Sequence, residues 1–196
     1  MKKLLVISSM LFMISACAQE EKPEIPPADL QIKTAVLPAP EDKKAGATVY
    51  GYNEEGEVVV LREGTNDLVC LADNPYNEGI SVSCYFKALD PFMKRGRTLK
   101  KEGKNTKEIR EIRGNEVAAG TLKMPDSPSM MYIFYGTDAA YDKTTGALGD
   151  GQFRYVIYTP FETAESTGLP TKPHAKGMPW IMDPGTHRAH IMVGPN

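Results

Sequence analysis

Several residue types that mark common protein classes are scarce in this sequence. Its 196 residues include three cysteines, three histidines and one tryptophan. Three cysteines are too few for a disulfide-dense miniprotein. The formal net charge of -2 excludes a strongly basic nucleic-acid-binding protein. Because 41% of the residues are hydrophobic, a fully disordered chain is also excluded, and the length suits a single domain.

The motifs of the commonest catalytic families are absent as well. The sequence contains no G-x-S-x-G, no S-x-x-K, no H-E-x-x-H and no G-x-x-x-x-G-K phosphate-binding loop. These absences argue against the commonest hydrolases and against NTPases. They do not exclude an enzyme that uses another chemistry.

The chain begins with a segment typical of an export signal. Met1-Lys2-Lys3 is positively charged, and the thirteen residues Leu4–Ala16 carry no charge and are mostly apolar. This run is too short for a transmembrane helix, which needs about 20 residues. It ends in Ile14-Ser15-Ala16-Cys17: an aliphatic residue, two small residues and a cysteine. The pattern predicts a signal peptide over residues 1–16.

Residues 1–17 resemble the leader and lipobox of bacterial lipoproteins. In that family the cysteine receives a diacylglycerol and becomes the acylated first residue, so the resemblance implies that Cys17 anchors the protein in a membrane. No aspartate follows Cys17, which in a Gram-negative cell implies the outer membrane. An ordinary cleaved signal peptide with an incidental Cys17 is the alternative. The rest of the chain resembles no characterised family.

The segment after the leader is rich in proline and charge. Five prolines lie between residues 23 and 40. Such a segment buries little apolar surface and tends to be extended. We therefore expect a lipidated tether over residues 17–46, in which the short run Leu30–Leu37 is a candidate for packing on the domain. One globular domain should follow over residues 47–196.

Short β-rich runs separated by turn signals dominate this domain. Strands are predicted at residues 48–52, 58–61, 68–72, 80–86, 130–135, 153–159 and 189–193. The first four have the spacing of an antiparallel meander. Residues 160–186 contain five prolines and are predicted to be mostly loop.

Two helices are predicted between the fourth and fifth strands. Asp90-Pro91 is typical of a helix start, and this helix should extend to about Glu102. Thr106 is a candidate cap for a second helix to about Ala119. The sequence therefore predicts an α+β fold: a mainly antiparallel sheet with two helices inserted on one face.

Cys70 and Cys84 lie in strands predicted to be adjacent, in a protein predicted to be exported. An oxidising location permits a disulfide, which would close a loop of about 15 residues and contribute about 3 kcal/mol. A reactive or metal-binding thiol is one alternative, although no C-x-x-C spacing and no nearby histidine support it. Two buried free thiols are the other.

The three histidines, His174, His187 and His190, surround a dense segment that contains Asp183 and the only tryptophan, Trp180. Imidazole and carboxylate groups suit Zn²⁺, so the three histidines are weak candidate metal ligands. No cofactor is predicted, and Zn²⁺ is the alternative.

The expected local structure argues against a shared metal. Asp183 begins a predicted turn, and residues three apart on the strand that follows, such as His187 and His190, point to opposite faces. We expect the histidines to bond to backbone groups in a loop packed by Trp180. The catalytic alternative is metal-free acid–base chemistry by His187, His190 and Asp183.

A basic stretch lies on the two predicted helices. Residues 94–113 contain nine Lys or Arg and three acids, a net charge of +6. A solvated helix face balanced by acids elsewhere is one interpretation. The other is a binding site for an anionic partner. Its candidate residues are Lys94, Arg95, Arg97, Lys100 and Lys101.

The leading functional hypothesis is a non-catalytic accessory lipoprotein that binds a component of the cell envelope, such as an anionic polymer, or a protein partner. Nucleic acid is disfavoured by the predicted location. A hydrolytic or metal-dependent enzyme that uses the C-terminal His/Asp cluster is the competing hypothesis. A purely structural envelope protein is the third.

Overall fold

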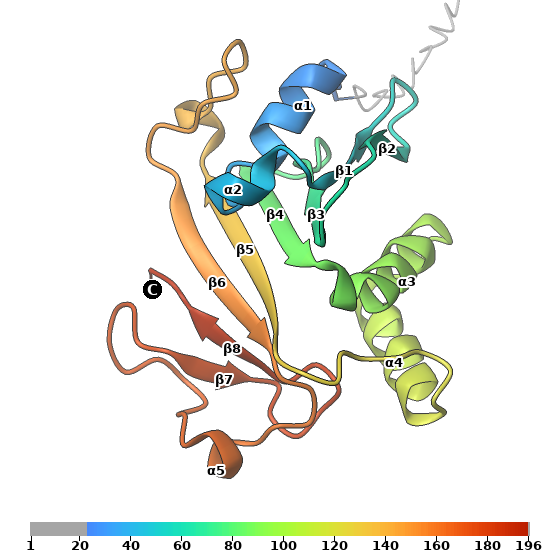
Figure 1. Ribbon diagram of the computed structural model, residues 1–196, viewed down its shortest axis with the longest axis vertical. Helices are drawn as coiled ribbons and strands as arrows, with labels where there is room; N and C mark the ends of the chain where they lie inside the picture. The colour runs from blue at the N-terminus through green and yellow to red at the C-terminus, as the bar shows by residue number, and fades with distance from the viewer. Residues whose placement is uncertain (1–22, 196) are drawn as a thin grey trace, which may run out of the picture.

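The computed structural model describes residues 23–195, so the predicted leader, Cys17 and the start of the predicted tether lie outside the described residues. Five α-helices, two short 3-10 helices (Lys87–Leu89 and Asp138–Ala140) and eight strands form this part of the chain (Figure 1). The helices are α1 (Ala28–Ala35), α2 (Glu41–Lys44), α3 (Asp90–Lys101), α4 (Thr106–Ala118) and α5 (Ala164–Thr167). The strands are β1 (Thr48–Tyr52), β2 (Val58–Arg62), β3 (Leu68–Leu71), β4 (Ile80–Phe86), β5 (Ser129–Gly136), β6 (Gln152–Tyr158), β7 (Trp180–Met182) and β8 (His190–Val193).

All eight strands belong to one sheet with the order β2-β1-β3-β4-β5-β6-β8-β7. Neighbouring strands are antiparallel except β1 and β3, which are parallel. The predicted α+β class with a mainly antiparallel sheet is therefore confirmed. The prediction of a simple meander is wrong at β3, which pairs with β1 and not with β2. The apolar strand β3 is almost completely buried and takes an inner position, whereas β2 exposes Val58 and Val60 at the edge.

One face of the sheet is covered by the N-terminal segment. Ala35 at the end of α1, with Ala39 and Ala47, packs against Val49 and the disulfide of β3 and β4. Helix α1 is also fixed to the end of β1 by its side chains. The amide of Gln31 donates to the carbonyl oxygen of Tyr52 at 2.9 Å and accepts from the backbone N–H of Tyr52 at 2.8 Å.

These contacts correct the predicted tether over residues 17–46. From residue 28 onward this segment is part of the folded domain, because its small residues fit closely against the sheet. Pro27 directly precedes α1, a position that does not interrupt a helix because the first N–H groups have no partner within it. The prolines therefore flank the helix and do not prevent it.

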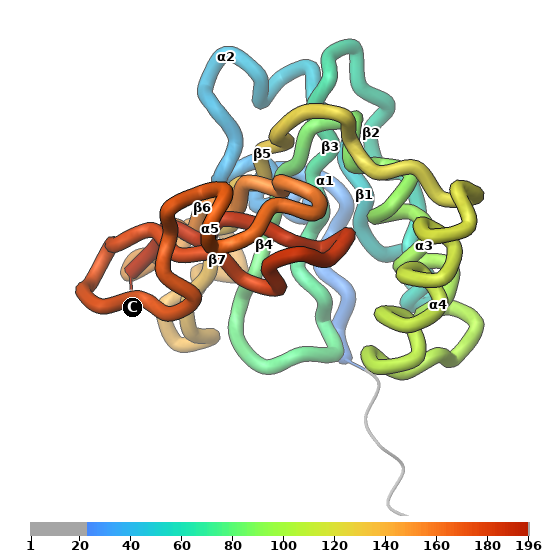
Figure 2. Tube along the Cα trace, turned by 90° about the horizontal axis from the view of Figure 1, so that it is seen from below, coloured from blue at the N-terminus to red at the C-terminus, as the bar shows by residue number. Residues whose placement is uncertain are grey.

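Helix α3 packs on the opposite face of the sheet. Its Phe92 and Leu99 are buried, and Phe92 contacts the ring of Tyr158 on β6 edge to face. Helix α4 packs against α3 and buries no residue completely (Figures 1 and 2). The predicted pair of helices on one face is therefore not confirmed as stated, since helices lie on both faces. The predicted cap of α4 also shifts by one residue, to Asn105, which forms a capping box with Glu108.

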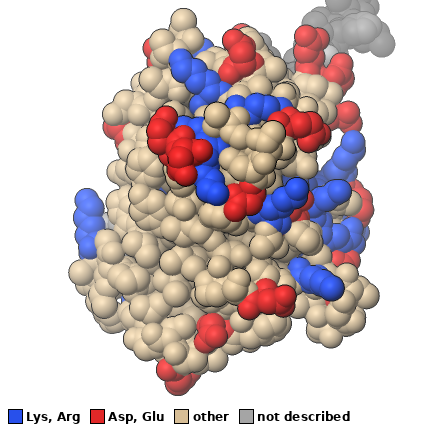
Figure 3. Space-filling model, in the orientation of Figure 1, with Lys and Arg blue, Asp and Glu red and all other residues tan. Residues whose placement is uncertain are grey.

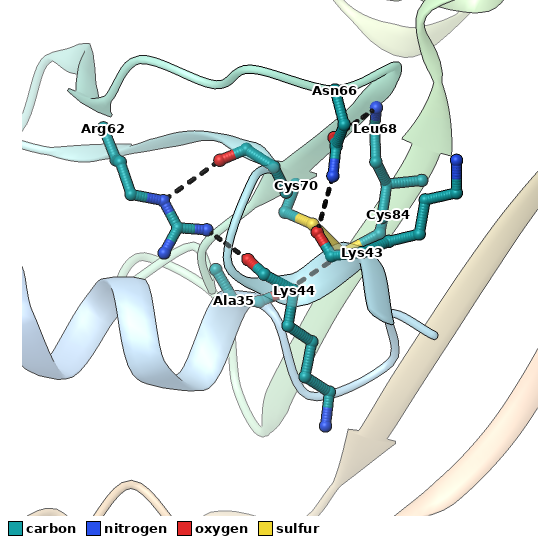
Figure 4. The surroundings of a disulfide bond; sticks show 9 residues. Ala35, Lys43, Lys44, Arg62, Asn66, Leu68, Cys70 and Cys84 are labelled. Carbon is teal, nitrogen blue, oxygen red and sulfur yellow. Dashed lines mark hydrogen bonds between the residues drawn. A yellow bond between two sulfur atoms is a disulfide. The ribbon is translucent and has the colours of Figure 1, made fainter. Parts of the chain in front are cut away.

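A disulfide joins Cys70 and Cys84, which lie directly opposite each other on β3 and β4. Both cysteines are completely buried. The segment predicted to be a tether covers the disulfide, with the carbonyl oxygen of Ala35 lying 3.3 Å from Cys84 Sγ (Figure 4). Arg62 holds this cover in place by donating to the carbonyl oxygens of Ala47 and Lys44.

Candidate functional site

The predicted turn at Asp183 connects β7 and β8 in an antiparallel hairpin. Thr186 Oγ1 donates to the carbonyl oxygen of Asp183 at 2.8 Å and accepts from the backbone N–H of Arg188 at 3.1 Å. Asp183 Oδ2 lies 3.2 Å from the guanidinium of Arg188. The predicted catalytic carboxylate is thus held by a salt bridge across its own turn.

His190, the first residue of β8, is buried with only 5% of its surface exposed. Its ring stacks on Tyr158, with 5.3 Å between the ring centroids, and its Nδ1 lies 2.6 Å from the carbonyl oxygen of Arg188. Burial is the main cause that lowers the pKa of His190. The imidazole is therefore a packed side chain bonded to the backbone, as the sequence suggested.

His187 contacts two helices, α3 and α4. Its ring meets Phe92 of α3 edge to face, with centroids 5.8 Å apart, and it packs against Gly114 of α4. A Cβ atom at Gly114 would lie 3.1 Å from the His187 ring, so the glycine makes room for the imidazole. Burial, followed by repulsion from Arg188 and Arg113, lowers the pKa of His187.

The structure thus brings His187, His190 and Asp183 around Arg188. His174 is exposed in the loop before β7. Within residues 23–195, no group of three or more His, Cys, Asp or Glu side chains could hold a metal ion. The Zn²⁺ alternative therefore gains no support from the described residues.

Three of the five candidate cations of the basic stretch on α3 are paired with acids, and no salt bridge within the described residues involves Lys94 or Lys100. Arg95 forms a bidentate salt bridge with Glu116 at 2.7 Å, and Lys101 pairs with Glu57 at 3.0 Å. Arg97 lies over the ring of Tyr50 and pairs with Asp90 at 3.1 Å. In Figure 3, basic and acidic side chains lie side by side over the region of α3 and α4. The interpretation as a balanced, solvated face fits this arrangement better than a single-sign binding patch.

An open aromatic surface lies on the sheet, on β5 and β6. We call it the aromatic face, and it consists of Tyr132, Phe134, Phe153 and Tyr155. Tyr132 is directly opposite Tyr155 and Phe134 is directly opposite Phe153, with ring centroids 6.2 Å and 4.6 Å apart. Helix α1 covers the neighbouring strands β1 and β4 on this side. Phe153 and Tyr155 remain 42% and 36% exposed.

Sequence reasoning identified both strands of this hairpin but missed the aromatic face. Phe153 and Tyr155 are two residues apart, which places them on one face of any strand. Their partners Tyr132 and Phe134 follow the same alternation. The missing information was the pairing register between β5 and β6, which depends on the long connection between these two strands.

A cavity of about 240 Å³ lies beside α1, lined by Pro26 and Leu30 and by the loops after β3 and β5. Two carboxylates on its wall accept backbone hydrogen bonds that stabilise these loops. Asp73 accepts from the backbone N–H of Ser81 at 2.8 Å, and Asp138 accepts from that of Gly79 at 2.9 Å. Burial, more than any other cause, raises the pKa of Asp73.

None of the helices in the described part of the chain has the length and apolar character needed to cross a membrane. Comparison of the chain with protein-family models, with curated proteins and with solved structures finds no match.

Proposed function

We propose that this protein is a lipid-anchored binding module of the bacterial cell envelope, and that its aromatic face receives a protein partner. The lipobox-like leader with Cys17 supports the anchor. The disulfide between Cys70 and Cys84 is consistent with an oxidising location such as the envelope. The single observation that supports binding best is the exposure of the aromatic face.

Exposed aromatic side chains are costly unless a partner covers them. Burial of apolar surface contributes about 25 cal/mol per Å², so contiguous rings gain substantially from contact with a second protein. Aromatic residues are enriched at the centres of protein interfaces, where they form most of the energetically important contacts. Phe153 and Tyr155 could form such contacts, because β6 is an inner strand of the sheet and holds both rings on a rigid backbone.

A protein partner fits the aromatic face better than an anionic polymer does. A polymer of that kind needs unpaired cations, whereas three of the five candidate residues, Arg95, Arg97 and Lys101, are engaged in salt bridges. Arg154, between Phe153 and Tyr155 in the sequence, lies on the other face of β6, where its guanidinium stacks on Tyr135 at 4.7 Å. The aromatic face therefore lacks a cation from its own strand.

A hydrolytic enzyme is the competing proposal, and it rests on the gathering of His187, His190 and Asp183 around Arg188. In the structure Asp183 is paired with Arg188, and the Nδ1 of His190 contacts the backbone. These engagements favour a structural role for the cluster. A purely structural envelope protein, the third proposal, offers no reason for exposing Phe153 and Tyr155.

The test is the size of the complex that the protein forms in detergent-solubilised native membranes. The double variant Phe153→Ser/Tyr155→Ser should elute at the mass of the free protein, whereas the wild type should elute in a larger complex. Tyr76→Ser is the matched control, because Tyr76 is 53% exposed but its ring contacts Tyr52 of β1 and no ring of the aromatic face. A wild type that elutes free, or a double variant that keeps the complex, would contradict the proposal.

A further inference from the structure

The cavity beside α1 is formed by three segments that lie far apart in the sequence. Helix α1 contributes Leu30, the connection between β3 and β4 contributes Asp73, and the connection between β5 and β6 contributes Asp138 and Tyr141. The volume of this cavity is about 240 Å³, whereas a site for one water molecule needs only about 10–15 Å³. The space therefore suits a small organic molecule.

A hydrogen bond fixes one wall of the cavity to α1. The hydroxyl oxygens of Tyr141 and Thr34 lie 3.1 Å apart, and Thr34 Oγ1 donates its own hydrogen to the carbonyl oxygen of Leu30 at 2.9 Å. Tyr141 must therefore donate to Thr34, because each hydroxyl carries a single hydrogen. The hydroxyl oxygen of Tyr141 keeps its lone pairs, so it can act toward a ligand only as an acceptor.

The wall offers few other hydrogen-bond donors. The side-chain amide of Gln31 is already engaged with the carbonyl oxygens of Pro26 and Tyr52, at 2.7 Å and 2.9 Å. Four prolines on the wall have no N–H group. Asn77 and Lys143, the remaining side chains that could donate, are both exposed. A ligand that complements this wall therefore has to supply the donors itself.

Two carboxylates give the cavity a negative charge. Asp73 accepts from the backbone N–H of Ser81 and Asp138 from that of Gly79, so both are held at the start of β4 by groups two residues apart, a span of at most about 7 Å. Burial, with further repulsion from Asp138, raises the pKa of the Asp73 carboxyl. A carboxylate has about four acceptor positions, so both keep free capacity.

These carboxylates lack a counter-charge from the protein. No salt bridge between residues in the described part of the chain involves Asp73 or Asp138. The wall also contains Glu24, so three carboxylates stand against the single ammonium of Lys143. Neighbouring carboxylates of this kind favour a cation.

We propose that this cavity binds a small organic amine, whose ammonium group is bound by Asp73 and Asp138 and whose apolar body packs against Leu30 and Ile80. An ammonium group has three donors and no acceptor, which complements a wall of acceptors. A bare metal ion suits the site less well, because no group of three or more His, Cys, Asp or Glu among residues 23–195 could hold one. The cavity shares no residue with the aromatic face and is independent of the proposed function.

The test uses the lipidated protein in a neutral detergent, with 2-phenylethylamine as the probe and calorimetric titration as the measurement. 2-Phenylethanol is the reference ligand, because it has the same apolar body without the charge. The amine should bind saturably, and the alcohol should bind about ten-fold more weakly or less, because hydrogen bonds to charged groups are the stronger ones. Titration of the detergent alone corrects for partition into micelles.

Asp73→Asn and Asp138→Asn should each weaken binding of the amine by about ten-fold or more. Both variants keep an oxygen that can accept the backbone N–H. The matched control is Asp150→Asn, which removes the same charge from an exposed position outside the cavity, in the same connection as Asp138, and should leave binding unchanged. Because Asp138 is exposed, Asp138→Asn tests the proposal even if Asp73→Asn does not fold.

Any of four results would overturn the proposal. Absence of saturable binding of the amine to the wild type would show that the cavity takes no such ligand. Equal affinity for the amine and the alcohol would show that the charge is not recognised. Equal weakening by Asp138→Asn and Asp150→Asn would show attraction by overall charge only. Unchanged affinity in a folded Asp138→Asn variant would remove this carboxylate from the site.

Discussion

The rings of Phe153 and Tyr155 lie nearly parallel on the same face of β6, with an interplanar angle of 13° and 6.1 Å between their centroids. Each side chain is also supported from β5, Phe153 by Phe134 and Tyr155 by Tyr132. The two exposed rings are therefore held in fixed orientations before any partner arrives. Such preorganisation lowers the entropic cost of binding.

This arrangement predicts that Phe153 contributes little to stability. Phe153→Ala should lower the free energy of unfolding by less than about 1 kcal/mol, because the ring is exposed. Phe92→Ala should cost about 3–5 kcal/mol, because that ring is buried between α3 and β6. Urea unfolding of both variants measures the difference. Equal costs would mean that Phe153 belongs to the core and that its exposure does not mark a binding surface.

The disulfide should contribute strongly to stability. Cys70 and Cys84 are separated by 14 residues, and closing a loop of that size stabilises the fold by about 3 kcal/mol. The double variant Cys70→Ala/Cys84→Ala should lose about that much in urea unfolding. Because both cysteines are completely buried beneath the N-terminal segment, a reductant should act on the native protein only slowly. Rapid reduction without unfolding would contradict the cover described for this bond.

Stability should fall when the pH drops from about 7 to about 5, because of the buried histidines. Burial lowers the pKa of His190 below its ordinary value of 6.5, while the hydrogen bond to the carbonyl oxygen of Arg188 opposes this shift and the charge of Arg188 adds to it. In this range the unfolded chain takes up a proton that the folded chain does not, so the free energy of unfolding decreases as the pH falls. The pKa of Glu116 is lowered below 4.5, chiefly by Arg95. Carboxylates of this kind reduce the free energy of unfolding only at more acidic pH, where they become protonated.

The variant His190→Gln separates the contribution of His190 to the pH dependence from that of the carboxylates. It should flatten the pH dependence of urea unfolding between about pH 7 and 5, even if it lowers stability overall. His174→Gln is the matched control, because His174 is exposed in the loop before β7. An unchanged slope in His190→Gln would assign the acid sensitivity to other groups.

The lipid anchor makes a separate prediction for Cys17. Cys17→Ala removes the thiol that receives the lipid, so the protein should no longer label with a palmitate analogue and should leave the membrane fraction. The folded domain should keep its melting temperature, because the described fold begins after this residue. A Cys17→Ala variant that is still acylated would contradict the resemblance to lipoproteins.

Much of the sheet was predictable because its strands carry local signals. Val49 and Val82 mark apolar alternation that is visible in a short window, and Asp90-Pro91 marks the start of α3. The four-residue helices α2 and α5 and the strand β7 were not predicted, and α1 was predicted only as a run, Leu30–Leu37, that could pack on the domain. The strand β7 has only three residues and follows Pro179, and α1 is flanked by prolines and buries small residues.

The candidate sites were less accessible to sequence reasoning because they depend on long-range pairing. The aromatic face requires the register between β5 and β6, which no local pattern specifies. Phe92 and His187 lie 95 positions apart and meet only because α3 packs against the sheet. A sum of charges over residues 94–113 cannot distinguish Arg113, which is half-buried, from its exposed neighbour Arg110.

Photo-crosslinking in native cells tests the central claim most directly. A benzophenone-bearing phenylalanine replaces Phe153 on the aromatic face, or Tyr76 as an exposed aromatic control elsewhere. A protein partner on the aromatic face predicts one covalent adduct of defined, larger mass at position 153, lost when Tyr155→Ser is added, and no such adduct at position 76. Absence of an adduct at position 153, or the same adducts at both positions, would contradict the proposed function.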